Sequence, residues 1–258
     1  MNIEGEAAIQ EVFKKGIIPD SIVAIIYDTY SSAWLISFAL LKSEIDKGNF
    51  GIISNYNLPI LNLSRAAEFV GLNLRSELEN GNVAVIDLFG SKYGSRFEFK
   101  NVFYLNYVDP ETLNPKIDVI YEREIKPILG DRMAFRMIYT LDGAALMLGE
   151  NMTLKLLNQA IAVKTKLMPN SVLVLPLNKD VVSQRFVAWT ISISEYVIVA
   201  SSKITEEGIE ERLHLVKSPL EDFAPSTYIL WTTKGRKAER LRVKRLTPEP
   251  RSLRKQQR

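Results

Sequence analysis

Short apolar runs rich in β-branched residues alternate along the chain with segments of helical periodicity. Such runs are typical of parallel strands that are buried on both faces. Strands are expected at residues 21–27, 50–54, 83–88, 135–141, 171–175 and 196–200. Helices are expected between them at residues 31–47, 62–72, 118–128, 153–167 and 181–190. The alternation predicts an α/β fold, a mostly parallel central sheet with helices on both faces.

The pattern changes toward the C-terminus. Residues 209–216, 227–232 and 239–246 read as sequential strands joined by turns, which predicts an antiparallel edge on the sheet. Residues 90–115 hold several glycines, prolines and aromatic residues, and we expect a surface segment with one short strand at 102–105. No domain linker is visible. We therefore predict one domain over residues 1–246 and a basic, disordered tail over 247–258.

Composition excludes several kinds of chemistry. The 258 residues include no cysteine and one histidine, His214. Disulfides, thiolate nucleophiles and metal sites with several histidines are therefore excluded, whereas a carboxylate site for Mg²⁺ stays open. The longest apolar stretch, residues 33–41, is far shorter than the roughly 20 residues of a membrane span. We expect a cytoplasmic protein with no membrane partner.

Two short motifs and the order of the elements resemble the KaiC-like branch of the RecA superfamily. Residues 15–19 (KGIIP) resemble the entry segment before the first core strand, and residues 231–236 (WTTKGR) resemble the closing hairpin. The resemblance spans roughly residues 13–246, and the chain is also similar to uncharacterised RecA-like proteins of hyperthermophilic archaea. It implies a three-layer RecA-like domain.

The phosphate-binding loop of that family is altered in this chain. An active member has G-x-x-x-x-G-K-[ST] directly after the first strand. Residues 27–34 read YDTYSSAW, with Tyr27 and Ser32 in place of the glycines. Ala33 replaces the lysine that neutralises phosphate charge, and Trp34 replaces the hydroxyl that holds Mg²⁺.

The other catalytic positions are altered as well. Residues 54–57 contain no carboxylate where the family has its catalytic glutamate, and Thr140 stands where the Walker B aspartate should end its strand. Asp142 follows two residues later. We expect a pseudo-ATPase with no catalytic residues, no metal and no cofactor. A remnant nucleotide pocket would be lined by Asp28, Thr29, Tyr30, Ser31, Ser32, Asn55 and Asp142.

A strongly basic segment ends the chain. Residues 234–258 contain eleven Lys or Arg and two Glu, a charge of +9; since the net charge is +3, the rest of the chain carries −6. These residues could form a nucleic-acid arm with salt-sensitive phosphate contacts, or a solvated edge strand protected by charge. The candidate nucleic-acid-binding residues are Lys234, Arg236, Lys237, Arg240, Arg242, Lys244 and Arg245.

Three further features have simple structural interpretations. The aromatic cluster Tyr93, Phe97, Phe99, Phe103, Tyr104 and Tyr107 could stack bases or form an interface, but a β-hairpin packed on the core is the favoured interpretation. His214 lies in an alternating strand with no evident catalytic partner. Asp118 and Glu122 have helical i, i+4 spacing that could hold a metal, although solvated charge is favoured.

Three functions remain open from the sequence. The first is a non-catalytic RecA-like module for binding, regulation or assembly, with a second copy or a related RecA-like protein as partner. The second is a nucleic-acid-binding accessory protein that uses the basic C-terminus. The third is an enzyme of another class, with Asp28, Asn55, Asp87 and Asp142 at the carboxyl ends of the parallel strands.

Overall fold

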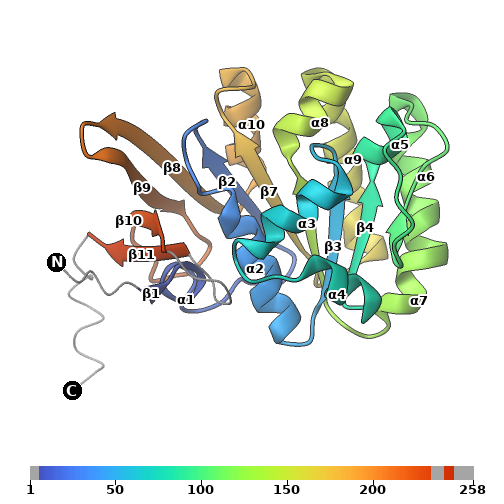
Figure 1. Cartoon of the computed structure of the whole chain (residues 1–258), viewed down its shortest axis with the longest axis horizontal. Helices are drawn as coiled ribbons and strands as arrows, with labels where there is room; N and C mark the ends of the chain where they lie inside the picture. Colours follow the sequence, from blue (N-terminus) through green and yellow to red (C-terminus); the bar gives the residue numbers. More distant parts are fainter. Residues whose placement is uncertain (1–5, 234–240, 247–258) are drawn as a thin grey trace.

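One mixed sheet runs through the molecule in the computed structural model, which describes residues 6–233 and 241–246. Within these residues it has eleven strands in the order β1-β11-β10-β9-β8-β2-β7-β6-β3-β4-β5 (Figure 1). The parallel strands are β2 (Ile22–Tyr27), β3 (Phe50–Asn55), β4 (Val83–Asp87), β5 (Val102–Phe103), β6 (Ala134–Tyr139), β7 (Val172–Asn178) and β8 (Tyr196–Thr205). The antiparallel part is β8 with β9 (Gly208–Lys217), β10 (Ser226–Thr232), β11 (Leu241–Arg245) and β1 (Glu6–Ala7).

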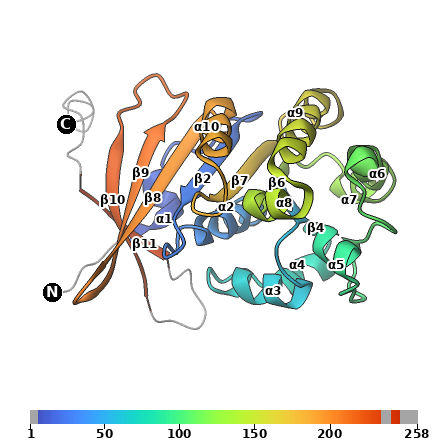
Figure 2. The same cartoon turned by 90° about the horizontal axis from the view of Figure 1, so that it is seen from above.

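Helices cover both faces of the parallel part, as Figure 2 shows from above. One face carries α1 (Ala8–Val12), α2 (Leu35–Asp46), α3 (Ile60–Glu68) and α4 (Leu74–Glu79). The other face carries α6 (Leu113–Ile120), α7 (Lys126–Leu129), α8 (Leu141–Leu148), α9 (Glu150–Leu167) and α10 (Gln184–Ile193). The short helix α5 (Leu88–Tyr93) follows β4, and a 3₁₀ turn, η1 (Pro110–Thr112), precedes α6.

The central strands are buried on both faces, which explains their unbroken apolar sequence. In β2, Val23 and Ile25 pack in the cluster with α1 and α2, whereas Ala24 and Ile26 pack in the cluster with α8 and α10. Successive side chains of a strand point to opposite faces, so every position of β2 must be apolar. This confirms the predicted strand and the predicted helices on both faces.

Several predicted boundaries were wrong, each for a local reason. The strand predicted at 135–141 ends at Tyr139, because the Thr140 side chain caps α8 by accepting the Gly143 N–H at 3.1 Å. The helix predicted at 118–128 begins at Leu113 and passes through a π-helical turn, η2 (Tyr121–Ile125). Pro127, in the first turn of α7, has no N–H to continue the regular α-helical pattern.

The aromatic segment does not form the expected hairpin. No strand forms at Phe97 or Phe99, and β5 is limited to two residues. Phe99 is partly buried against the core, whereas Phe97 is exposed, and their ring centroids are 6.3 Å apart. The helices α4, α5 and α8 were also not predicted. They are six to eight residues long, too short for a clear helical period.

Candidate functional site

The loop after β2 lies at the carboxyl end of the parallel strands, where open α/β sheets bind their ligands. It covers residues 28–34 and leads into α2. The side chain of Asp28 fixes the loop to the β8–β9 hairpin by accepting the Ser202 N–H at 2.6 Å. Tyr30 projects from it and is 61% exposed.

A carboxylate of the chain itself occupies the second half of this loop. Glu211 of β9 accepts the Ser32 N–H at 2.7 Å, the Ser32 hydroxyl at 2.8 Å and the Ser31 hydroxyl at 2.9 Å. In an active phosphate-binding loop, such backbone N–H groups point at the phosphate. Here they point at a carboxylate that is 179 residues away in sequence from Ser32.

A second carboxylate binds the first half of the loop. Asp180 accepts the Thr29 N–H at 2.9 Å and the Thr29 hydroxyl at 3.1 Å. Asn178, at the end of β7, extends this network, since its amide donates to the Thr29 hydroxyl at 3.4 Å. Asp142 joins from α8 by accepting the Asn178 N–H at 3.0 Å. Carboxylates of the same chain therefore accept the N–H and hydroxyl groups of Thr29 and Ser32 and the hydroxyl of Ser31.

The residues that replace the lysine and the metal ligand are packed into the protein. Ala33 is fully buried. The Trp34 ring lies edge-on to Phe38 and Phe69, with centroid distances of 6.3 and 6.4 Å. Ala33 belongs to the apolar core on the α2 and α3 face and the half-buried Trp34 packs against this core, so neither contributes charge or a metal ligand to the loop.

Asn55 and Asp87 meet at the ends of the adjacent strands β3 and β4. The Asn55 amide donates to Asp87 Oδ1 at 2.9 Å and to the Leu58 carbonyl at 2.6 Å. Asp87 also caps α5 by accepting the Gly90 N–H at 2.9 Å. Burial raises the pKa of Asp87, and the hydrogen bonds from Gly90 and Asn55 lower it in part. Burial likewise raises the pKa of Asp142, and the hydrogen bond from the Asn178 N–H lowers this pKa in part.

The predicted pocket residues are thus brought together in three groups. Thr29 and Asp142 belong to a network between β2, β7 and α8; Ser31 and Ser32 bind Glu211; and Asn55 binds Asp87. Asp28 instead binds Ser202 of β8, and the exposed Tyr30 belongs to none of these groups. The sequence prediction missed Asp180 and Glu211, although these two side chains hold the loop.

Glu122 and His214, two residues singled out from the sequence, contact neighbouring side chains. Residues 6–233 and 241–246 contain no cluster of three or more histidine, aspartate or glutamate side chains that could hold a metal ion. Glu122 pairs with Lys126 at 3.0 Å, and the Nδ1 atom of His214 lies 3.0 Å from the Thr227 hydroxyl. The His214 ring therefore pairs across β9 and β10, a contact that the sequence analysis did not predict.

The basic C-terminal candidates fall mostly outside the described residues. Lys234, Arg236, Lys237 and Arg240 lie there, as does the tail 247–258. Arg242, Lys244 and Arg245 belong to β11, in which Lys244 is exposed. β11 lies between β10 and the two-residue β1. Nucleic-acid binding through this segment stays a prediction.

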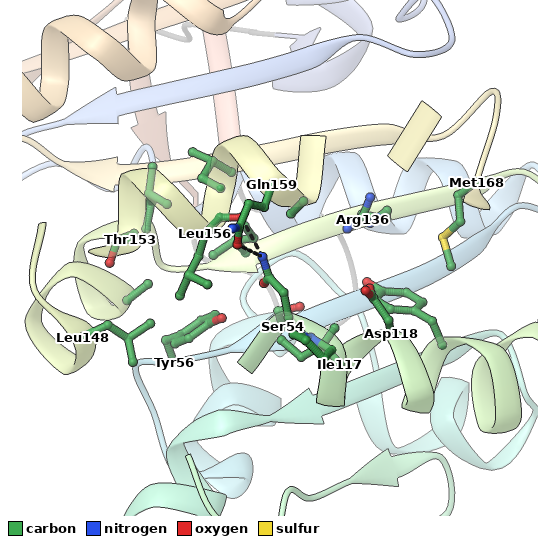
Figure 3. Close-up of a pocket in the computed structure, with 18 residues that line it drawn as sticks. Ser54, Tyr56, Ile117, Asp118, Arg136, Leu148, Thr153, Leu156, Gln159 and Met168 are labelled. Carbon is green, nitrogen blue, oxygen red and sulfur yellow. Dashed lines mark hydrogen bonds between the residues drawn. The ribbon is translucent and has the colours of Figure 1, made fainter. Parts of the chain in front are cut away.

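A cavity of about 380 Å³ lies on the other side of the sheet, between β3, β6 and the helices α6, α8 and α9 (Figure 3). Its volume falls in the range of small-molecule sites. Much of its wall is aliphatic, from Ile117, Ile138, Leu141, Ala144, Leu148 and Leu156. Asn114 ties α6 to α9 beside it, since its amide donates to the Leu156 carbonyl at 3.0 Å and to Gln159 at 3.2 Å.

Two opposite charges face this cavity. Arg136 comes from the middle of β6 and Asp118 from α6, and Figure 3 shows both near the end of the cavity marked by Met168. The Arg136 guanidinium carbon lies 5.3 Å from the centre of the Tyr121 ring. Burial raises the pKa of Asp118; Arg136 lowers this pKa and Glu122 raises it further. An arginine inside an otherwise apolar strand was the sequence signal for this cavity, and the sequence analysis missed it.

Comparison with known proteins identifies the fold. No protein-family model matches the sequence, and no curated protein matches it significantly. A KaiC-like protein of the hyperthermophilic archaeon Pyrococcus horikoshii OT3 is similar in structure, with a TM-score of 0.68, 15% identity and coverage of 93% of this chain and 96% of that one. An uncharacterised protein of Pyrococcus horikoshii, solved in complex with an unknown peptide, has a TM-score of 0.75 and 20% identity over 95% of this chain and 100% of that one.

These neighbours confirm the predicted fold class. The chain has the RecA-like fold of KaiC-like proteins, with a mostly parallel sheet, helices on both faces and an antiparallel C-terminal part. The expected likeness to RecA-like proteins of hyperthermophilic archaea is confirmed at the level of the fold. Among the helices of residues 6–233, none combines the length and the apolar character needed to cross a membrane.

Proposed function

We propose that this chain is a RecA-fold binding module that neither binds nor hydrolyses nucleoside triphosphates at the loop after β2. One observation supports this most directly. The Glu211 carboxylate accepts the N–H and hydroxyl groups of Ser32 that would otherwise face an anion. A phosphate placed there would be repelled by Glu211, Asp180 and Asp28, and residues 28–34 contain no cation to offset this repulsion.

A calorimetric titration of the full chain with Mg-ATP and with Mg-ADP tests this proposal. We expect no heat of binding up to millimolar nucleotide and no phosphate release above the buffer rate. Micromolar binding of either nucleotide, or a Mg²⁺-dependent ATPase rate lost in Asp142→Asn, would overturn it. The Asp131→Asn variant is the control, because Asp131 is exposed and lies outside the loop network.

The same proposal includes a partner, either a second copy of this chain or a related RecA-like protein. The β8–β9 hairpin projects from the sheet (Figure 1), and Ile204 and Ile209 face each other near its tip. They are 62% and 53% exposed. Apolar side chains so exposed on a projecting element favour an interaction surface. The unknown peptide bound to one structural neighbour supports testing protein segments as partners as well.

A further inference from the structure

Arg136 and Asp118 lie in the wall of the cavity, where the charge of Arg136 acts on Asp118 from beyond hydrogen-bond distance. Among the described residues, neither side chain has a hydrogen bond or an ion pair with a group of opposite charge. The Nε atom of Arg136 is buried, and its N–H has no hydrogen-bond acceptor among the described residues. Buried polar groups almost always have a hydrogen-bond partner, so this arrangement requires an explanation.

The position of Arg136 increases the cost of leaving its Nε atom without a hydrogen-bond partner. Arg136 lies in β6 between Phe135 and Met137, which are buried, and its guanidinium is held over the Tyr121 ring. A cation–π contact leaves the in-plane N–H donors free for a carboxylate. Asp118 is an acceptor on the facing helix α6. Both residues are half-buried, and a ligand with complementary charges would supply the hydrogen bonds that they lack.

We propose that the cavity binds a zwitterionic amino acid with a large apolar side chain. The ligand carboxylate accepts from Arg136, the ligand ammonium group donates to Asp118, and the side chain lies among Leu148, Leu156 and Ala144. The cation Arg136, the anion Asp118 and the aliphatic wall beyond them match the carboxylate, the ammonium group and the apolar side chain of such a ligand. The inference deepens the proposed binding role by naming a ligand class, and it uses a cavity that shares no residue with the loop after β2.

Three probes of nearly the same shape separate the charges of the ligand. L-phenylalanine has both charges, 3-phenylpropanoate lacks the ammonium group, and 2-phenylethylamine lacks the carboxylate. In calorimetric titrations of the full chain, we expect phenylalanine to bind at least tenfold more tightly than either analogue. Equal affinity for all three, or no binding of phenylalanine at millimolar concentration, would overturn the inference.

Variants then assign each charge to its residue. Arg136→Gln should lower the affinity for phenylalanine at least tenfold and leave the affinity for 2-phenylethylamine within twofold of wild type. Asp118→Asn should lower the affinity for phenylalanine at least tenfold and leave the affinity for 3-phenylpropanoate within twofold. Arg123→Gln is the matched control, since Arg123 is exposed on the neighbouring π-helical turn and should change nothing.

A third variant locates the binding if a charge variant fails to fold. Ala160→Phe fills the cavity from α9, where Ala160 is only partly buried, and should abolish phenylalanine binding while the circular dichroism spectrum stays native. Unchanged binding in this variant would overturn the inference. Nucleotide binding would overturn only the proposed function of the loop, so the two failures are distinguishable.

Discussion

The carboxylate of Glu211 accepts the backbone N–H of Ser32 at 2.7 Å and so joins the antiparallel hairpin to the carboxyl end of the first core strand. The same carboxylate accepts two serine hydroxyls. We expect Glu211→Ala to lower the free energy of unfolding by about 2 kcal/mol, because hydrogen bonds to a charged group typically contribute about 1.5 to 3 kcal/mol. Urea denaturation followed by circular dichroism measures this change.

Glu210 is the matched control for this prediction. It is the preceding residue of β9, it is exposed, and it points to the opposite face of the hairpin. Glu210→Ala should change the free energy of unfolding by less than about 0.5 kcal/mol, as exposed substitutions usually do. Equal losses in both variants would show that Glu211 does not hold the loop.

The buried carboxylate of Asp142 predicts a pH dependence of stability. Because burial raises its pKa in the folded protein, the folded state binds the proton more tightly than the unfolded state does. The free energy of unfolding contributed by this group therefore falls as the pH rises from the ordinary aspartate range, about 4, through the raised pKa. Asp142→Asn keeps the oxygen that accepts the Asn178 N–H and removes the charge.

We expect the unfolding free energy of Asp142→Asn to fall less with pH than that of the wild type. The stability of the variant relative to wild type should increase as the pH rises from about 4, and this increase should stop above the raised pKa of Asp142. Asp131→Asn, an exposed control, should follow the wild-type curve. Unfolding curves in urea at several pH values make the comparison, and parallel curves for Asp142→Asn and wild type would contradict the prediction.

The sequence predicted the strands and part of the candidate site because both depend on local information. The continuous apolar runs at β2 and β4 predicted both strands to within a residue at each end. Asn55 and Asp87 end neighbouring parallel strands, so their contact follows once the strand order is known. Asp142 was predicted to lie past its strand, and the cap formed by Thr140 explains why.

The parts that the sequence could not predict depend on contacts distant in the chain. Glu211 reaches Ser32 only because the fold places β9 beside the loop, and no local pattern encodes a contact between residues 179 positions apart. The predicted strand at 171–175 stopped before Pro176, but β7 continues to Asn178. The ladder from β7 to β6 ends at Val174, so the missing N–H of Pro176 breaks no sheet hydrogen bond on that side.

Close packing around Gly90 predicts a large effect of a small substitution. A Cβ atom at this position would lie 2.6 Å from Asp87 Oδ2, 2.6 Å from the Ser95 carbonyl oxygen and 2.8 Å from the Tyr104 ring. Gly90→Ala should lower the free energy of unfolding by about 1 to 3 kcal/mol, because the Ser95 backbone must move. Lys92→Ala, on the exposed side of the same helix, should have little effect in the same urea denaturation. An unchanged midpoint for Gly90→Ala would mean that this segment adapts freely.

The exposed pair at the tip of the β8–β9 hairpin predicts how the protein assembles. Ile204 and Ile209 contribute little to the core, so the double variant Ile204→Asp with Ile209→Asp should keep the fold and lower the free energy of unfolding by about 1 kcal/mol or less, because it places two like charges directly opposite each other. If this tip is the contact between copies, the variant should have the mass of one chain in light scattering while the wild type has a multiple of it. Lys203→Asp, one position further from the tip, keeps both isoleucines and should retain the wild-type mass. If the double variant keeps the assembled mass of the wild type, the hairpin tip is excluded as the contact. Two aspartates facing each other could not remain buried in an apolar interface.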